Sequence, residues 1–255
     1  MNALVETELE HGVLTVRLNR PEKKNALTGE MYTALADALD QGARERAVRV
    51  LLVTGTAGVF TAGNDIADFL TPPDPGEERP VNRFLLALAR TEVPLVAAVD
   101  GMAVGVGTTM LLHFDQVFAT ERARFSLPFI NLGLVPEAGS SMLLVETCGY
   151  RKAAELLMLG EPFSAQEAQR CGIVSRLCSE ETLLEEATRA ARALAAKPRG
   201  ALRATKRLMR RPPEPLETRI HEESLKFFEA LKSPEAREAL TAFLEKREPD
   251  FTQFD

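Results

Sequence analysis

The stretch DGMAVGVGT at residues 100–108 decides how this chain folds, because it joins an apolar run to a helix through closely spaced glycines. The run at 94–99 is typical of a buried strand, and apolar residues at helical spacing follow the glycines. A second stretch, FTAGND at residues 60–65, follows the apolar run at 48–54 in the same way. Such a turn leaves N–H groups unpaired at the start of its helix. Two such turns side by side would direct two amides at one oxygen, which predicts an oxyanion hole and chemistry on a carbonyl group.

The size and composition are those of an ordinary globular protein. The chain has 255 residues, of which 45% are hydrophobic and 27% charged, enough for one core and a small appendage. A net charge of −6 argues against nucleic acid as the main partner. Since no apolar run approaches a membrane span and no signal peptide begins the chain, we expect a protein with no membrane partner. Three scattered cysteines without a CxxC pair predict reduced thiols, a cytoplasmic location and no metal site.

The first half of the chain alternates between strand and helix patterns, which predicts an α/β fold. The residues around the tripeptide at 10–12 predict a hairpin, and apolar spacing predicts helices before and after the first glycine turn. The proline-rich residues 71–80 predict an exposed, mobile loop. The expected strands are 4–9, 13–18, 48–54, 94–99, 114–119 and 124–126, and the expected helices are 28–43 and 81–91.

The second half is predicted to be helical. Ser164 to Glu167 has the pattern of a capping box, and residues 181–197 have strong helical spacing. Ser233 and Pro234 are typical of the N-cap and first residue of a last helix, which we expect to end near Arg247. Strands followed by helices predict a core domain at 1–197 and a helical region at 198–255.

Two side-chain groups in the helical region have more than one interpretation. Phe227, Phe228 and Phe243 either close a pocket or pack in an interface between subunits, and packing is the favoured interpretation. A basic cluster is either the solvated face of a helix or a site for phosphates or for a subunit contact. It consists of Arg203, Lys206, Arg207, Arg210 and Arg211.

Several common catalytic motifs are missing. The stretch GVGTTM at 105–110 lacks the third glycine of a dinucleotide fingerprint, and no GxxxxGK[ST] is present for nucleotide hydrolysis. No GxSxG is present, and the three histidines have no evident nucleophile partner. His113 lies in an apolar run, so we expect a core histidine with satisfied hydrogen bonds and not a ligand.

Glu137 is the informative carboxylate. It lies in the apolar segment NLGLVPEAGSS at 131–141, directly before a helix. A glutamate at a helix start can simply interact with the helix dipole. Alternatively, the apolar surroundings remove water from the carboxylate and raise its pKa toward neutrality, as a general base requires.

Together these three segments resemble the crotonase, or enoyl-CoA hydratase/isomerase, superfamily. The resemblance extends through LNRPEKKNAL at 18–27, FSLPF at 125–129 and AFLEKR at 242–247, and therefore covers nearly the whole chain. It implies a spiral of ββα units with a C-terminal helical trimerisation region, and a homotrimer or a hexamer built as a dimer of trimers. It also implies an acyl-CoA thioester as substrate, with coenzyme A part of that substrate and no separate cofactor or metal.

The resemblance assigns roles to particular positions. The oxyanion-hole donors would be the backbone amides of Asn64 and Val106, although the family commonly has glycine at the second position. Lys246 matches a lysine that reaches the coenzyme A phosphates of a neighbouring subunit, or is a surface charge of the last helix. The other positions implied to line coenzyme A are Lys24, Ala26, Ala62, Asp65 and Ile66.

Two departures from the family pattern bear on the reaction. Hydratases of this family use two glutamates, and this chain has Thr109 and Phe129 at those positions. Glu137 instead matches the single catalytic glutamate of the peroxisomal-type Δ3,Δ2-enoyl-CoA isomerases. The resemblance therefore implies an enoyl-CoA isomerase that moves a 3-enoyl double bond to the trans-2 position through a thioester dienolate. The alternatives are a hydratase, lyase or thioesterase of the same family, with carboxylates from Asp65 or the 71–80 loop, and a non-catalytic acyl-CoA binder.

Overall fold

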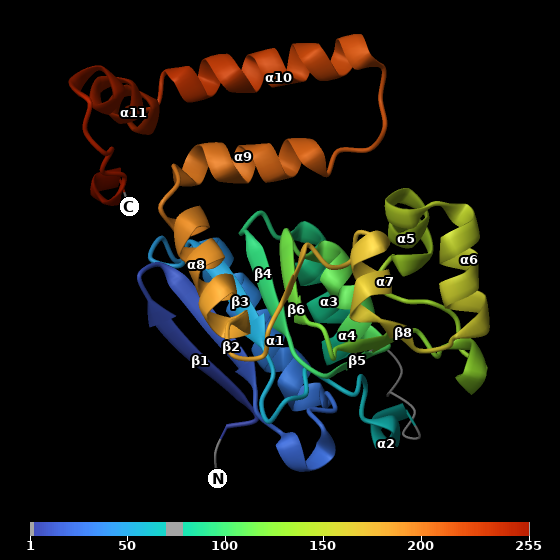
Figure 1. Cartoon of the computed structure of the whole chain (residues 1–255). Coiled ribbons are helices and arrows are strands. Elements are labelled where there is room, and N and C mark those ends of the chain that lie inside the picture. Colours follow the sequence, from blue (N-terminus) through green and yellow to red (C-terminus); the bar gives the residue numbers. More distant parts are fainter. Residues whose placement is uncertain (1–2, 70–78, 255) are drawn as a thin grey trace.

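The computed structural model describes residues 3–69 and 79–254, and its centre is a six-stranded sheet (Figure 1). The strand order is β1-β2-β3-β4-β6-β9, with β1 antiparallel to β2 and every other neighbouring pair parallel. The expected α/β class is therefore confirmed. The strands are β1 Val5–Glu10, β2 Val13–Leu18, β3 Val50–Thr54, β4 Leu95–Val99, β6 Gln116–Thr120 and β9 Arg176–Cys178.

Both faces of this sheet are covered by helices. All five residues of β4 are buried, as expected for a central strand of a parallel sheet. Helix α8 (Leu183–Ala195) packs its alanines against β3, β4 and β6 on one face. Helices α1 (Gly29–Arg44) and α3 (Pro80–Arg90) pack on each other and contribute to the larger core on the other face.

The β1–β2 hairpin closes one edge of the sheet. Its two-residue turn consists of His11 and Gly12, with φ angles of 49° and 78°, so the chain makes the left-handed turn that suits a tight hairpin. The outer strand β1 carries alternating glutamates and is mostly exposed, which protects the edge from pairing with another chain.

A smaller sheet accompanies the first and gives the chain a repeating course. Its order is β5-β7-β8, with β5 parallel to β7 and β8 antiparallel to β7. The chain passes from β4 to β5 to a helix, and again from β6 to β7 to a helix, so the expected ββα repeat is present. These strands are β5 Met102–Val104, β7 Arg124–Ser126 and β8 Phe163–Ser164.

The remaining elements of the core are short helices. Ser164 caps α7 by accepting a bond from the Glu167 amide at 3.2 Å, as the sequence predicts. Of the loop expected at 71–80, residues 71–78 lie outside the described residues, and Pro80 begins α3. These helices are η1 Pro21–Lys23, α2 Ile66–Phe69, α4 Val106–Thr109, η2 Met110–His113, η3 Ile130–Leu132, α5 Ser140–Cys148, α6 Tyr150–Leu159 and α7 Ala165–Arg170.

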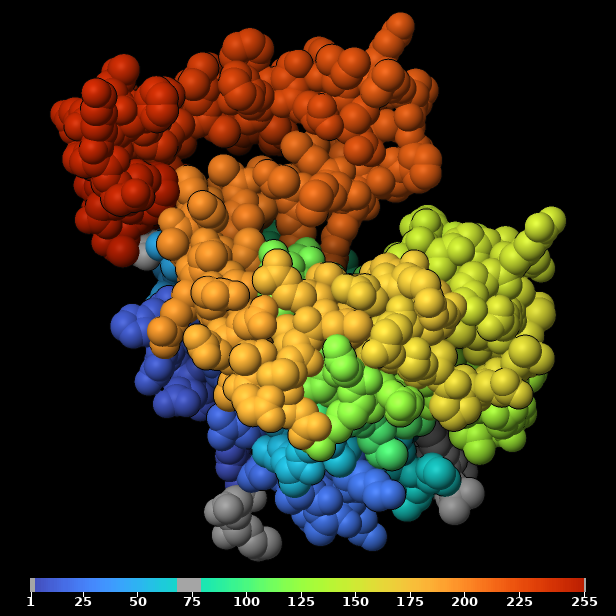
Figure 2. Space-filling view, in the orientation of Figure 1, coloured from blue at the N-terminus to red at the C-terminus, as the bar shows by residue number. Residues whose placement is uncertain are grey.

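The C-terminal region consists of three helices and a short last turn. Figure 1 shows α10 running beyond α9, away from the sheet, with α11 at its far end. The space-filling view shows the same helices standing off the body of the molecule (Figure 2). Ser233 caps α11 as expected, and that helix ends at Glu245, two residues before the expected end. The elements are α9 Arg199–Met209, α10 Leu216–Leu231, α11 Pro234–Glu245 and η4 Thr252–Phe254.

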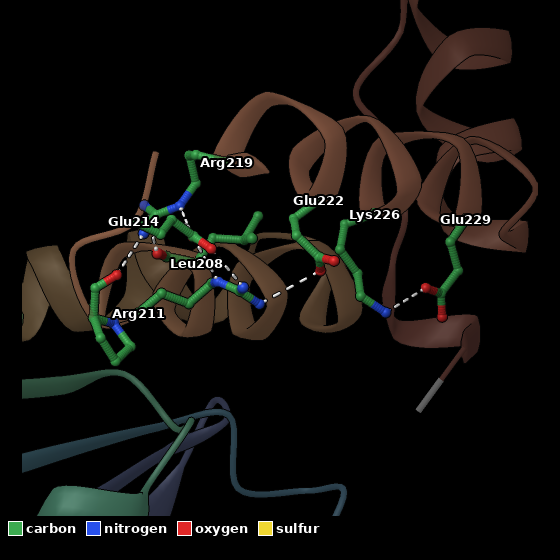
Figure 3. A network of polar contacts seen from close by, with 8 residues as sticks. Leu208, Arg211, Glu214, Arg219, Glu222, Lys226 and Glu229 are labelled. Atoms are coloured by element: carbon green, nitrogen blue, oxygen red, sulfur yellow. Dashed lines mark hydrogen bonds and ion pairs between the residues drawn. The ribbon is translucent and has the colours of Figure 1, made fainter. Parts of the chain in front are cut away.

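Charged side chains connect α9 to α10. Around the turn between the two helices, Glu214 accepts from Arg211 at 2.9 Å and from Arg219 at 2.5 Å (Figure 3). Arg211 also reaches Glu222 on α10 at 3.4 Å. The neighbouring Arg211 and Arg219 lower the pKa of Glu214 to about 2. These ion pairs stabilise the turn between the two helices. On α10, Phe227 and Phe228 remain 65% and 59% exposed in the single chain.

Part of the basic cluster is buried, in contrast to the solvated face that the sequence suggested. Lys206 is only 3% exposed, so it does not lie on a solvated face. Its Nζ donates to Val93 O and to Asp115 Oδ2, both at 2.7 Å. Burial lowers the pKa of Lys206 to about 8, against the opposing effect of the nearby Asp115 carboxylate. Arg203 likewise donates to Gly42 O at 2.7 Å, so these two cations attach α9 to the core.

We expect Lys206→Met to lower the stability of the fold. The substitution leaves the Asp115 carboxylate without its cation, and that carboxylate is only 21% exposed. Breaking a buried pair costs about 3–5 kcal/mol, and partial exposure of Asp115 reduces this to about 2–3 kcal/mol. Thermal unfolding should show a Tm lower by about 5–10 °C. Arg207→Met is the matched control on the same helix, because its pair with Glu92 is exposed, and it should change little.

Candidate active site

Backbone hydrogen bonds bring together most of the positions predicted to line coenzyme A. The Ala62 amide donates to Lys24 O at 2.9 Å, and the Leu27 amide donates to Gly63 O at 2.8 Å. The Asp65 amide then donates to Leu27 O at 2.9 Å. The segments at 24–27 and 62–65 therefore run side by side and place Lys24, Ala26, Ala62 and Asp65 in one strip of the surface.

The two glycine turns lie in direct contact, as the sequence predicts. The Thr61 amide donates to Met102 O at 2.9 Å, and the Val104 amide donates to Thr61 O at 3.1 Å. A Cβ atom on Gly63 would lie 2.6 Å from Val104 O, and one on Gly107 would lie 2.5 Å from Thr61 Cγ2. Glycine is required at both positions, because any side chain would push the two turns apart.

Each turn ends in an amide that has no acceptor. Within residues 3–69 and 79–254, neither the Asn64 amide nor the Val106 amide donates a backbone or side-chain hydrogen bond. The parallel bridge between Leu27 and Asn64 uses the Gly63 carbonyl and the Asp65 amide, so it leaves the Asn64 amide out. Val106 is the first residue of α4, where the N–H has no partner in its own helix. Val106 is fully buried, so an N–H without an acceptor among the described residues is costly there.

Side chains fix the residues around the first turn. The Tyr32 hydroxyl donates to the Asn64 side-chain Oδ1, and the Tyr32 ring packs against Phe84 with centroids 5.6 Å apart. Arg20 Nη1 lies 2.7 Å from Asp65 Oδ2 and also donates to Ala26 O at 3.0 Å. The hydrogen bond from Arg20 lowers the pKa of Asp65. Asp65 is therefore a paired carboxylate and is poorly suited to carry a proton near neutral pH.

Glu137 is half-buried next to the second turn. Its Oε1 accepts from the Thr109 hydroxyl at 2.5 Å, and Thr109 lies in α4, whose first residue is Val106. Its Oε2 is buried and has no hydrogen-bond partner among the described residues. Burial raises the pKa of Glu137, against the smaller opposing effect of the Thr109 bond. A half-satisfied carboxylate with a raised pKa is suited to take up and return a proton.

The backbone around Glu137 is tightly specified. Pro136 precedes it, and Ala138 and Gly139 follow with left-handed φ angles of 56° and 70°. The Glu137 carbonyl accepts from the Ser140 hydroxyl at 2.7 Å, which anchors it to the start of α5. His113 Nε2 lies 2.8 Å from Ala138 O and is 9% exposed, which confirms the expected core histidine.

The structure also places the two positions where this chain lacks the hydratase glutamates. Thr109 is fully buried and its hydroxyl donates to Glu137, so it lies beside that carboxylate without adding a charge. Phe129 is 7% exposed, and its ring lies about 4.0 Å from the Cβ position of Gly105. An apolar ring therefore stands beside the second turn.

One remaining predicted contact adjoins the end of the strip, and the other lies far from it in the single chain. Ile66 begins α2 and is 62% exposed. Lys246 caps the end of α11 with a φ angle of 57° and is exposed. Figure 1 shows α11 far from α2, so Lys246 reaches the other positions only if a different subunit supplies it.

Sequence reasoning missed some supporting residues. Arg20 holds Asp65 and Tyr32 holds Asn64, across 45 and 32 residues of chain. No local spacing signals these long-range pairs. The spacing of Thr109 and His113 does carry a signal, because residues four apart in a helix share a face, and both contact the 137–138 segment.

Comparison with known proteins identifies the family. A model described as enoyl-CoA hydratase/isomerase matches residues 8–254, so the chain belongs to this family. The structure described as an enoyl-CoA hydratase/carnithine racemase from Magnetospirillum magneticum AMB-1 superposes with a TM-score of 0.95. It is 48% identical and covers 99% of this chain and 100% of its own, so the expected crotonase-like fold is confirmed.

Similar relatives carry both kinds of activity in their names. The 1,2-epoxyphenylacetyl-CoA isomerase of Escherichia coli is 35% identical over 99% of both chains. The 2,3-dehydroadipyl-CoA hydratase of the same organism is also 35% identical, over 94% of both chains. Enoyl-CoA delta isomerase 2 of Rattus norvegicus is 36% identical over 79% of this chain and 53% of its own length. Overall similarity therefore does not separate isomerase from hydratase.

In the residues that the structure describes, no helix is both long and apolar enough to cross a membrane. In those same residues, His, Cys, Asp and Glu side chains do not gather in any group of three or more that could hold a metal.

We expect Glu137→Gln to be more stable than the wild type near pH 8. Because burial raises the pKa of Glu137 above 4.5, the folded state binds this proton more tightly than the unfolded chain. Ionisation above pH 4.5 therefore costs folding stability, and the cost is complete once the pH exceeds the raised pKa. Removing the charge should raise Tm by about 2–4 °C, the effect of about 1 kcal/mol in a chain of this length.

The measurement is thermal unfolding by circular dichroism near pH 8 and near pH 4, where the difference between the two proteins should shrink. Glu8→Gln on the exposed edge strand is the control and should leave Tm unchanged. A lower Tm for Glu137→Gln near pH 8 would show that the carboxylate stabilises the fold.

Proposed function

We propose that this protein is an enoyl-CoA isomerase that converts 3-enoyl-CoA to trans-2-enoyl-CoA, with Glu137 as its one proton shuttle. The carboxylate takes a proton from C2, which is acidic because it lies between the thioester and the double bond. The electron pair moves through the double bond system to give a dienolate with charge on the thioester oxygen. The glutamic acid then returns the same proton to C4, so the carboxylate is regenerated and no co-reactant is consumed.

The state of Glu137 is the observation that carries this proposal. One oxygen of the carboxylate is oriented by Thr109 while the other is buried and unpaired. An unpaired buried oxygen is costly to keep, and it is the atom that a proton shuttle needs. A raised pKa also makes the proton easier to hold on the enzyme between the two transfers.

The amides of Asn64 and Val106 are the proposed binding site for the thioester oxygen. In support, both N–H groups lack an acceptor in the described part of the chain, and the turns that carry them are locked together. Each donor of an oxyanion hole stabilises developing charge by about 3–4 kcal/mol. Val106 begins α4 and Thr109 ends it, so the helix that carries one oxyanion donor also carries the hydroxyl that holds Glu137.

Hydration is the competing activity, and the residues at the site favour isomerisation. Adding water requires one group to activate it and another to protonate the α-carbon. Thr109 and Phe129 stand where hydratases have those carboxylates, and Asp65 is committed to Arg20 with a lowered pKa. The apolar Phe129 ring also excludes water from the neighbourhood of the second turn.

We further propose that the acyl-CoA lies along the strip formed by residues 24–27 and 62–65, with Ile66 beside it. Lys246 would be supplied by a neighbouring subunit of a homotrimer or a dimer of trimers. Phe227, Phe228 and Phe243 are 59–80% exposed in the single chain, which favours packing between subunits over pocket closure. Three free cysteines fit a reducing compartment, and we propose the cytoplasm.

We expect Glu137→Gln to abolish isomerisation while leaving acyl-CoA binding intact. Loss of the base should lower kcat by about 100- to 10,000-fold, because that is what general acid–base catalysis contributes. The measurement is incubation with 3-enoyl-CoA, with products separated by chromatography, and binding of a saturated acyl-CoA by calorimetry. Incubation of wild type with trans-2-enoyl-CoA in water tests hydration. Formation of 3-hydroxyacyl-CoA as the main product would identify a hydratase and contradict the proposal.

The pH dependence of the reaction should report the Glu137 carboxylate. The base must be ionised to accept the C2 proton, so kcat/KM should fall as pH drops through its raised pKa. We expect the acidic limb of the profile to lie above the ordinary glutamate value of 4.5. Replacing Thr109 by Val removes the bond that stabilises the carboxylate, so the limb should move to still higher pH. A limb at or below 4.5 would exclude Glu137 as the base.

A further inference from the structure

Two side chains from one helical segment hold the loop that carries Glu137. Thr109 ends α4, His113 ends η2, and the two are four residues apart in a continuous helical run, on one face. Thr109 bonds the Glu137 side chain, and His113 bonds the backbone carbonyl of the next residue, Ala138. In the proposed reaction Thr109 orients the Glu137 carboxylate, whereas His113 has no role.

The bond from His113 stabilises an unfavourable backbone conformation. Ala138 has a φ of 56°, and a non-glycine residue in this left-handed region costs roughly 1 kcal/mol or more. Its carbonyl lies 2.8 Å from His113 Nε2. Because a carbonyl oxygen only accepts, Nε2 carries the proton, and the neutral ring has this tautomer. The same φ of Ala138 determines how the preceding residue, Glu137, enters the site.

The C-terminal helical region supports this histidine from behind. The Arg210 guanidinium donates to the backbone carbonyl of His113 and to Thr91 O at 3.2 Å. Lys206, one helical turn earlier on α9, is bound to Asp115 two residues beyond His113. Burial is the main cause that lowers the pKa of His113. The bond to Ala138 raises this pKa, and the nearby charges of Arg210 and Lys206 lower it further. The lowered pKa favours the neutral ring, which keeps its donor at Nε2.

We propose that His113 is a positioning residue for the Glu137 base. By holding the Ala138 carbonyl, it keeps Glu137 Oε1 on Thr109 and leaves Oε2 buried and free for the substrate proton. His113 does not touch the substrate in this scheme. The inference rests on the proposed function of Glu137 for its catalytic consequence, while its structural content concerns the loop alone.

The test compares His113→Leu with His113→Gln. Leucine fills the space without a donor, whereas the amide of glutamine places an N–H near the position of Nε2. We expect His113→Leu to lower kcat for 3-enoyl-CoA by about 10- to 100-fold with little change in KM, because a small misplacement of the base is enough. The acidic limb of its pH profile should move to lower pH, because water gains access to the carboxylate. His113→Gln should recover most of both effects, and His11→Asn in the exposed hairpin turn is the control.

A second readout does not depend on turnover. Carbon-13 NMR of labelled glutamate carboxyls, with the Glu137 signal assigned by its loss in Glu137→Gln, reports the pKa of this group directly. We expect that pKa to fall toward the ordinary range in His113→Leu and to stay raised in His113→Gln. If His113→Leu does not fold, His113→Ala takes its place in both measurements.

The outcomes separate the two proposals. A wild type without isomerase activity, with a Glu137 pKa that still responds to His113→Leu, would refute the proposed function and leave the positioning role standing. An active wild type whose kcat and Glu137 pKa are unchanged in His113→Leu would overturn the positioning role. Equal losses in the leucine and glutamine variants would overturn it as well, because they would show that the donor is not what matters.

Discussion

The close contact between the two glycine turns is the constraint on which the rest of the structure depends. Thr61 pairs with the 102–104 strand through two backbone bonds, and Gly63 and Gly107 leave no room for a side chain between the turns. Pairing at this point satisfies Thr61 and the 102–104 strand, while among the described residues the amides of Asn64, two residues before α2, and of Val106, at the start of α4, have no acceptor. The fold thereby creates a pair of free donors as a consequence of how its strands end.

The elements that could be predicted are those specified by local pattern. The 94–99 run is entirely apolar and becomes the fully buried β4, and the His11-Gly12 turn closes the predicted hairpin. The crotonase-like class followed from motifs spread along the chain. The buried, unpaired oxygen of Glu137 was not predictable in this way, because it depends on Thr109, 28 residues earlier, and on how the 136–139 loop packs.

The basic cluster on α9 shows why spacing alone misassigns charge. Three of the cluster's cations lie on α9 and two follow it directly, which matches the pattern of a solvated face, and helical spacing contains no information about a distant carboxylate. Asp115 is 91 residues away in the sequence, yet it lies 2.7 Å from Lys206 and makes burial of that ammonium tolerable. On the same helix, Arg207 pairs with Glu92 at the exposed surface, as a solvated face predicts. A non-local partner therefore decides which cations are structural.

This chain is about one third identical both to an isomerase and to a hydratase. The difference between these reactions therefore lies in a few side chains. Here those side chains change the charge of the site, since a threonine and a phenylalanine replace carboxylates around one remaining glutamate. A second carboxylate near Glu137 would raise the cost of ionising either group. Among the described residues no second carboxylate shifts the pKa of Glu137, and its Oε2 is unpaired, which suits a reaction that takes up no proton and releases none overall.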